Sequence, residues 1–390
     1  MDTAERLLGL DCTATGERYA PDHVGRSDAG APVTPVYDLD AVDPTALPAD
    51  PDSMWDYDAL LPVAAGDAVS AAEGATPLLD ADELATDLGV DAVLLKDEGR
   101  NPTGTILDRG LSVAVTMAEK GDADLLALAA AGDAGQSAAA YAGRIDTDCY
   151  AYVPSRAPFP NKAMVNVHGA DMRVIGGRYP DALEALQSDL VTDWYSLQEF
   201  TTPYRHDGYR TLAYEVAGAR DWTAPDAVVV AVGTGETLVG IERGFRDLIE
   251  LGLVDRMPRV HAVQAEGCAP VVDAHDAGAD AVDPVTYPDT ICGELEIPNP
   301  AGGSLALDAL AESGGEAVVV SDEDLLESAV ALTQRLGTEV GATGGAAAAG
   351  AWALSEQGAF DDDETVVVVN ADAGVKTADL LRSHLMSQGV

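Results

Sequence analysis

The sequence predicts an α/β protein in which layered helices surround mostly parallel sheets. Three features favour this class: short continuous apolar runs, stretches of helical period between them, and glycine clusters directly after several runs. Strands buried on both faces have such continuous apolar runs, and helices between them supply the crossover connections that parallel strands need. The predicted strands are 92–96, 124–130, 149–153, 172–175, 227–232, 259–265, 317–320 and 365–370.

Three glycine clusters follow predicted strands, at 129–137, 232–240 and 370–374. In open α/β sheets, ligands bind beyond the carboxyl ends of the strands. A glycine loop that leads into a helix also offers backbone N–H groups to an anion. The three clusters therefore predict a ligand-binding edge.

The composition describes an acidic globular chain. Of 390 residues, 22 are Lys or Arg and 67 are Asp or Glu, giving a net charge of −45, while 47% are hydrophobic. This length favours two domains, and the scarcity of basic residues argues against binding to nucleic acid or to anionic lipid. The acids are scattered along the whole chain, so we expect a halophilic protein, because molar salt screens such repulsion over about 3 Å.

Cysteine spacing and hydropathy exclude further classes. Cys12, Cys149, Cys268 and Cys292 form no Cys-x-x-Cys pair, so we expect reduced structural cysteines and no metal site. The first residues carry acids where a secretory leader needs basic groups, and no apolar run reaches the 18 residues of a membrane span. We therefore expect a cytoplasmic protein with no membrane partner.

Eight segments carry the most specific motifs of the chain. They are SMWDYDALLPV at 53–63, EGATPLL at 73–79, 94–115, AGDAGQSAAAYAGR at 131–144, 203–216, 228–245, 263–272 and AGVK at 373–376. Together they resemble one enzyme family, threonine synthase, and they occur in the family's order, which makes chance similarity an inadequate explanation. This family consists of fold type II pyridoxal-phosphate enzymes, similar in fold to the tryptophan synthase β-subunit, that convert O-phosphohomoserine into threonine.

The resemblance implies two α/β domains with mostly parallel sheets and a cleft between them. A large domain would comprise 76–106 and 205–390, with a small domain inserted at 107–204 and an N-terminal segment, 1–75, packing on the large domain. Pyridoxal phosphate would bind in the cleft with a small-molecule ligand. The resemblance also implies a role in amino-acid metabolism, and we expect a homodimer.

The position of the family's Schiff-base lysine is occupied by Leu107. The family motif reads Asn-Pro-Thr-Gly-Ser-Phe-Lys-Asp-Arg-Gly, whereas this chain has NPTGTILDRG at 101–110. A Schiff base needs a primary amine, and the same amine moves protons between substrate carbons, so leucine can do neither. We therefore expect no catalytic residue at this position and no covalent binding of the cofactor. Lys96 and Lys376 are the least remote amines, and we expect both to be structural.

The resemblance also implies a set of cofactor-binding positions, several of which have changed. Asp133 replaces an asparagine that would hydrogen-bond the cofactor ring. Glu236 replaces a small residue in the phosphate loop. Ala371, which is followed by Asp372, replaces a hydroxyl residue that would contact the pyridine nitrogen. Like charges in a desolvated cleft repel, so these changes disfavour a phosphate dianion. The implied positions are Asp133, Gly233, Thr234, Gly235, Glu236, Thr237 and Ala371.

Other charged residues near these motifs have simpler explanations. We expect Glu98, Asp108 and Arg109 to cap the helix that starts near Arg109 and to pair with one another. His206, beside two arginines, could contact an anionic ligand or join the two domains, and both interpretations stay open. The Ala-rich run after Glu339 predicts a tightly packed helix.

Three hypotheses for function follow. The first is a threonine-synthase-like paralogue without Schiff-base catalysis, a pseudoenzyme that acts in binding or regulation. The second is an active pyridoxal-phosphate-dependent lyase that forms threonine from O-phosphohomoserine with another lysine or an exchanging cofactor. The third is a small-molecule sensor that uses the old cleft, with Asp133, Glu236 and Asp372 attracting a cation. The sequence leaves open whether the chain is an enzyme.

Overall fold

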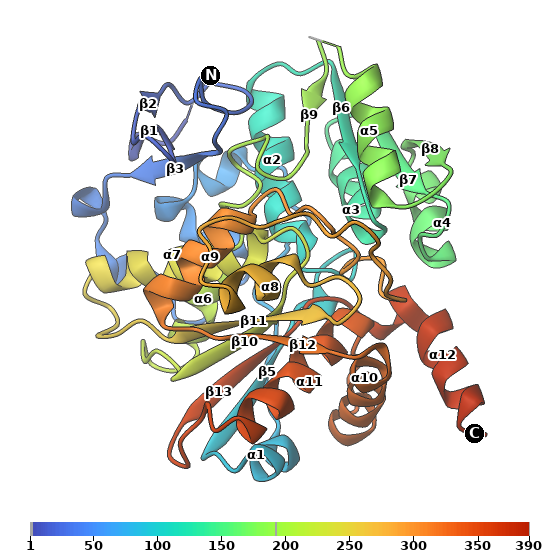
Figure 1. Ribbon diagram of the computed structural model, residues 1–390. Coiled ribbons are helices and arrows are strands. Elements are labelled where there is room, and N and C mark those ends of the chain that lie inside the picture. Colours follow the sequence, from blue (N-terminus) through green and yellow to red (C-terminus); the bar gives the residue numbers. More distant parts are fainter. Residues whose placement is uncertain (1–2, 192, 390) are drawn as a thin grey trace. The chain divides into compact units, whose positions relative to one another are not determined.

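The computed structural model describes residues 3–191 and 193–389, and it is an α/β structure (Figure 1). All eight predicted strands form, which confirms the predicted fold class. Their bounds are β5 (Ala92–Asp97), β6 (Leu125–Ala129), β7 (Asp148–Pro154), β8 (Asp171–Ile175), β10 (Ala227–Ala231), β11 (Arg259–Ala265), β12 (Ala317–Val320) and β13 (Thr365–Asn370). The prediction did not include β1 (Leu7–Cys12), β2 (Arg18–Tyr19), β3 (Val33–Tyr37), β4 (Leu78–Asp80) or β9 (Tyr195–Ser196).

The described residues divide into two compact units. Unit 1 consists of 1–75, 107–223 and 243–255, and unit 2 consists of 76–106, 224–242 and 256–390. Unit 1 thus combines 1–75 and 107–223, whereas the expected small domain comprises 107–204 alone. The expected domain assignment stays a prediction.

Unit 2 is built on a six-stranded sheet in the order β12-β11-β10-β13-β5-β4. Its strands are parallel except for β4, which pairs antiparallel with β5. Valines fill β13, and Val366–Val369 are all fully buried, as expected for a central strand covered on both faces. The helices of this unit are α1 (Asp82–Leu88), α8 (Pro270–Asp276), α9 (Gly303–Ser313), α10 (Asp322–Leu336), α11 (Ala342–Glu356) and α12 (Ala378–Ser387).

Helix α11 is the Ala-rich run, and it packs tightly as predicted. A Cβ at Gly345 would lie 2.1 Å from the Leu325 carbonyl oxygen of α10, and one at Gly350 would lie 2.2 Å from Cγ2 of Val263 in β11. The small residues of α11 thus allow the helix to lie directly against both a neighbouring helix and the sheet. Its buried alanines join the core formed by α1, α10 and β13.

Unit 1 contains two smaller sheets. One is fully parallel, in the order β8-β7-β6-β9, and α2 (Leu107–Lys120) and α3 (Asp133–Ala142) supply core residues against it. The other is an antiparallel N-terminal sheet in the order β2-β1-β3. The remaining helices are α4 (Phe159–Val167), α5 (Tyr179–Asp189), α6 (Arg210–Gly218) and α7 (Glu236–Glu250), which runs from unit 2 into unit 1.

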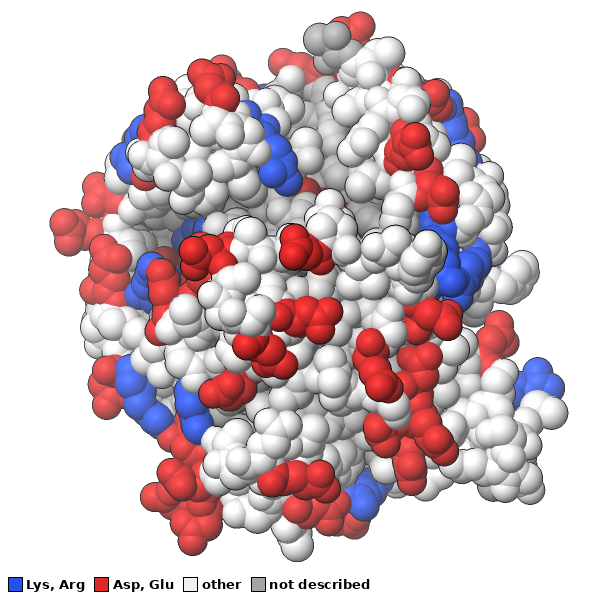
Figure 2. All heavy atoms as spheres, in the orientation of Figure 1, with Lys and Arg blue, Asp and Glu red and all other residues white. Residues whose placement is uncertain are grey.

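The acidic residues are dispersed over the surface. Figure 2 shows Asp and Glu across the whole visible face, with Lys and Arg in a few small groups. In the part of the chain that the structure describes, no helix is long and apolar enough to cross a membrane.

Candidate functional site

The loop before Leu107 is hydrogen-bonded to the segment that contains Ala371, although the two are far apart in sequence. In unit 2, the Ile106 N–H donates to the Ala371 carbonyl at 2.7 Å, and the Ala373 N–H donates to the Gly104 carbonyl at 2.9 Å. Thr105 and Asp372 also form a β-bridge. Gly104 has φ +76°, which a glycine adopts without strain. Ala371 and the loop that ends at Ile106 thus lie side by side in unit 2.

The glycine loop after β10 keeps its tight turn. Gly235 has φ +97°, and a Cβ there would lie 3.1 Å from the Gly302 carbonyl oxygen. A Cβ at Gly233 would lie 2.6 Å from the Glu294 carbonyl oxygen. Glycine is therefore required at both positions, and the loop leads directly into α7. Thr234, whose carbonyl accepts from the Gly302 N–H at 3.0 Å, and Thr237 are partly exposed.

Glu236 is the first residue of α7, and its side chain is only 2% exposed. A carboxylate at this end of a helix is stabilised by the partial positive charge of the first turn. The same place would attract the phosphate of a ligand. Glu236 thus brings a fixed negative charge to the position where the glycine loop would bind an anion.

Asp372 adds a second buried carboxylate at the carboxyl end of β13. It accepts a hydrogen bond from the Thr343 hydroxyl, and its backbone carbonyl accepts from the Gly341 N–H at 3.0 Å.

Burial raises the pKa of the Cys292 thiol well above its ordinary value, and the charges of Glu294 and Asp372 raise it further. Cys292 is therefore a protonated, buried thiol, as expected for a structural cysteine.

Leu107 begins α2 in unit 1, and its hydrocarbon side chain is used in packing. It is partly buried against the hydrophobic core that α2, α3 and the four-stranded sheet share. The helix begins two residues earlier than expected, at Leu107 rather than near Arg109. Leu107 is therefore a partly buried packing residue at the position that the family motif gives to lysine.

The charged residues after Leu107 have buried partners that the sequence did not reveal. Arg109 donates to both carboxylate oxygens of Glu215, at 2.7 and 2.8 Å, and also to the Thr211 hydroxyl at 2.9 Å. Asp108 accepts from the Ser137 hydroxyl at 2.5 Å. The expected pairing of Glu98, Asp108 and Arg109 with one another stays a prediction, and Asp108 and Arg109 also bond to residues of later helices.

Asp133 is buried at the start of α3, directly after Gly132. It occupies the first turn of a helix that follows β6, where the partial positive charge of the helix N-terminus favours a carboxylate. Asp133 belongs to unit 1, whereas Glu236 and Ala371 belong to unit 2.

His206 and its neighbours form a buried network within unit 1. The His206 Nε2 lies 3.2 Å from the Thr34 hydroxyl, and its ring stacks on Phe200. Burial, together with Arg243 and Arg210, lowers the pKa of His206 well below its ordinary value, so the ring is neutral. Arg205 donates to the Leu197 carbonyl at 2.9 Å. These contacts give the group a structural role within unit 1.

The two lysines considered as substitutes lie in different surroundings. The Lys96 ammonium donates to the Thr76 carbonyl at 2.7 Å and lies 4.0 Å from the Glu98 carboxylate. Lys376 is also buried, and its Cε lies 3.3 Å from the position that a Cβ would take at Gly104. Of the two, Lys376 therefore borders the loop that leads to Leu107.

The chain combines a parallel α/β scaffold with a glycine loop at a helix N-terminus. This combination is typical of the class of proteins that bind phosphorylated ligands. A family model described as pyridoxal-phosphate dependent enzyme matches residues 69–372, and the chain belongs to this family. It is a threonine-synthase-like member of fold type II, and the family implies pyridoxal phosphate as cofactor.

Individual relatives agree with this assignment. The chain is 33% identical to a threonine synthase of Methanosarcina acetivorans, covering 93% of this chain and 91% of that protein. It is 31% identical to a threonine synthase of Methanocaldococcus jannaschii, over 94% and 93% of the two chains. A fungal L-serine ammonia-lyase from Rhizomucor miehei has a similar fold, with a TM-score of 0.70 at 20% identity, covering 80% of this chain and 97% of that one.

Proposed function

We propose that this chain is a threonine-synthase-like paralogue that has kept the scaffold and lost Schiff-base catalysis, and that it acts in binding or regulation. The observation that carries the proposal is Leu107. Its side chain is partly buried and packs against the core of unit 1 at the place where the family motif has its lysine. A hydrocarbon there can neither bond to an aldehyde nor transfer a proton.

The buried carboxylates support the same conclusion. Asp133 and Glu236 lie at helix N-termini, and Asp372 lies at the carboxyl end of β13. The residues therefore do not fit a pyridoxal phosphate held in the family's way, because the amine is missing and a carboxylate stands where the phosphate dianion would lie. Conversion of O-phosphohomoserine to threonine is accordingly not part of this proposal.

The test is an absorption spectrum of the purified protein in molar salt, recorded before and after addition of pyridoxal phosphate. We expect no Schiff-base absorbance in the unmodified chain, and a Schiff-base band after the substitution Leu107→Lys. A Schiff-base band in the unmodified chain would contradict the proposal.

The second candidate is an active lyase, and one observation favours it. Lys376 is a buried amine beside Gly104, three residues before Leu107. If Lys376 replaced the missing lysine, the unmodified chain would show the band, and Lys376→Arg would abolish it. Lys96→Arg serves as the matched control, because the Lys96 ammonium is held by the Thr76 carbonyl.

A sensor function is the third candidate, in which the acidic residues Asp133, Glu236 and Asp372 attract a cationic ligand. The proposal also includes binding of a small-molecule ligand between the expected domains, a homodimeric state, a cytoplasmic location and adaptation to high salt. Sedimentation in molar salt tests the dimer.

A further inference from the structure

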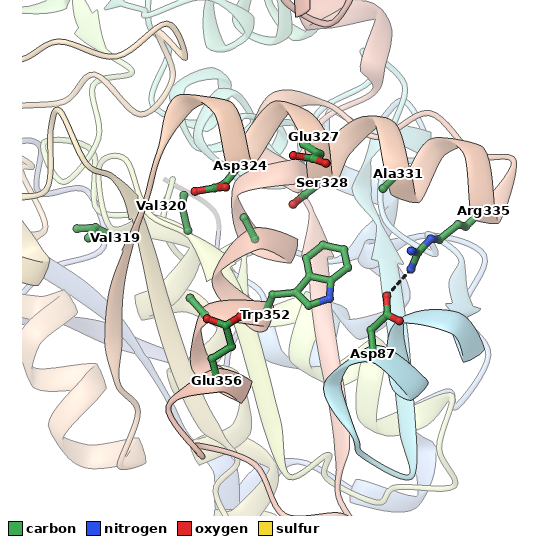
Figure 3. A pocket seen from close by; sticks show the side chains of 12 residues that line it. Asp87, Val319, Val320, Asp324, Glu327, Ser328, Ala331, Arg335, Trp352 and Glu356 are labelled. Carbon is green, nitrogen blue, oxygen red and sulfur yellow. Dashed lines mark hydrogen bonds and ion pairs between the residues drawn. The ribbon is translucent and has the colours of Figure 1, made fainter. Parts of the chain in front are cut away.

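A cavity of about 440 Å³ lies within unit 2, and none of its lining residues belongs to the glycine loop after β10. Helices α10 and α11 form its two long walls, with contributions from β12 and α1 (Figure 3). The lining residues recur at helical spacing, so each wall is one face of a helix. They are Asp87, Val319, Val320, Asp324, Glu327, Ser328, Ala331, Arg335, Ala349, Trp352, Ala353 and Glu356.

An aromatic ring stands between the two walls. Trp352 projects from α11 toward α10, and Figure 3 shows its ring below the side chains of Asp324, Glu327 and Ser328. The ring is only partly buried, so one surface is available to a ligand. An indole is the best aromatic surface for a cation, because its π-face is negative.

The charged groups of the cavity are predominantly negative. Glu327 and Glu356 have no hydrogen bond or ion pair with another residue that the structure describes. Arg335, the one cation of the lining, is already paired with Asp87 at 2.6 Å and with Glu83 at 3.4 Å. The cavity therefore offers negative charge to a ligand and no available positive charge.

Ser328 supplies a polar group that faces the cavity. The residue is 7% exposed, and its hydroxyl forms no hydrogen bond with another described residue. In Figure 3 the hydroxyl oxygen faces the space above the Trp352 ring. The hydroxyl is therefore available to accept a hydrogen bond from a ligand that enters the cavity.

We propose that this cavity binds an alkylammonium cation. The ammonium group would lie over the Trp352 ring, donate to the Ser328 hydroxyl and neutralise the carboxylates of Glu327 and Glu356, while its alkyl part would contact Ala331, Ala349 and Ala353. Anions are disfavoured by the carboxylates, and a neutral alcohol would leave them without a counter-charge. This site does not depend on the function proposed above.

The test is a ligand-observed NMR titration of the full chain with n-butylammonium chloride at constant ionic strength, with n-butanol as the neutral comparison. We expect saturable binding of n-butylammonium and none of n-butanol. Glu327→Gln combined with Glu356→Gln should weaken binding about fivefold, because two charges facing the ligand are lost. Trp352→Leu should weaken it by a similar factor of about five, because the cation loses its aromatic surface.

Glu323→Gln is the matched control, because Glu323 is an exposed acid on α10 that does not line the cavity. It should leave the affinity unchanged, whereas Ser328→Ala should lower it without altering the charge. The proposal is overturned if n-butylammonium does not bind, if n-butanol binds equally well, or if Glu323→Gln weakens binding as much as Glu327→Gln. Circular dichroism of each variant confirms that it is folded before titration.

Discussion

The substitution Glu215→Gln tests whether the charged residues after Leu107 hold the fold. Glu215 accepts two hydrogen bonds from the guanidinium of Arg109 and one from the Ala75 N–H at 2.9 Å. Arg109 is completely buried and Glu215 nearly so. Glutamine is nearly the same size as glutamate, so the substitution removes the negative charge and leaves the packing around residue 215 almost unchanged.

The expected loss is large because the buried Arg109 guanidinium would lose the charge of Glu215, to which it donates two hydrogen bonds. Removing one partner of a buried ion pair costs about 3–5 kcal/mol of unfolding free energy. An exposed pair contributes below about 1 kcal/mol and is screened by salt. The matched control is therefore Asp11→Asn, which breaks the Arg18–Asp11 pair, in which Arg18 is 46% exposed.

The assay is urea unfolding followed by circular dichroism, at both moderate and molar salt. We expect Glu215→Gln to lower the midpoint strongly at both salt concentrations, and Asp11→Asn to have a small effect that disappears in molar salt. Equal losses for the two variants would refute the argument that the Arg109–Glu215 pair is a buried structural contact.

Three further predictions concern stability. Gly350→Ala should destabilise the fold by about 1–3 kcal/mol, since the new methyl would overlap Val263, whereas Gly66→Ala, with no atom within 4 Å, should be near neutral in thermal unfolding. Burial and the charge of Arg259 lower the pKa of His261 to about 4. Between pH 6.5 and 4 the unfolded chain therefore binds a proton that the folded chain does not bind. The unfolding free energy falls as the pH falls through this range. His261→Gln should remove this loss, about 3 kcal/mol at most, as measured by the difference in unfolding free energy between pH 7 and pH 4.5; an unchanged pH dependence would contradict the assignment. With a net charge of −45, the unfolding free energy of the unmodified chain should rise from 0.1 M to 1 M salt, where the Debye length falls from about 10 to about 3 Å, and a flat salt profile would argue against halophilic adaptation.

The sequence predicted most strands of the parallel sheets, because many of them are buried along nearly their whole length and have unbroken apolar runs. Val366–Val369 illustrate this, since every position is buried and the apolar run is unbroken. The missed strands are β1, β2 and β3, which form the antiparallel N-terminal sheet, and the short strands β4 and β9. Hydrogen bonding to distant partners determines such strands, and their own composition indicates them poorly.

The candidate site was only partly predictable. Glycine motifs located the loops at Gly104 and Gly235, because a positive φ and close backbone packing require that residue. The partner of Arg109 could not be predicted, since Glu215 is distant in sequence and only folding brings the two together. The sequence indicates the cavity beside Trp352 only weakly, through the helical spacing of residues 324, 327 and 331 along one face of α10.

The most direct test of the central claim is to incubate the unmodified chain with pyridoxal phosphate in molar salt, reduce it with borohydride and measure its intact mass. Reduction makes any imine between the cofactor and a lysine permanent. We predict a mass equal to that of the untreated chain, with the adduct appearing in Leu107→Lys. A phosphopyridoxyl adduct on any lysine of the unmodified chain would contradict the account.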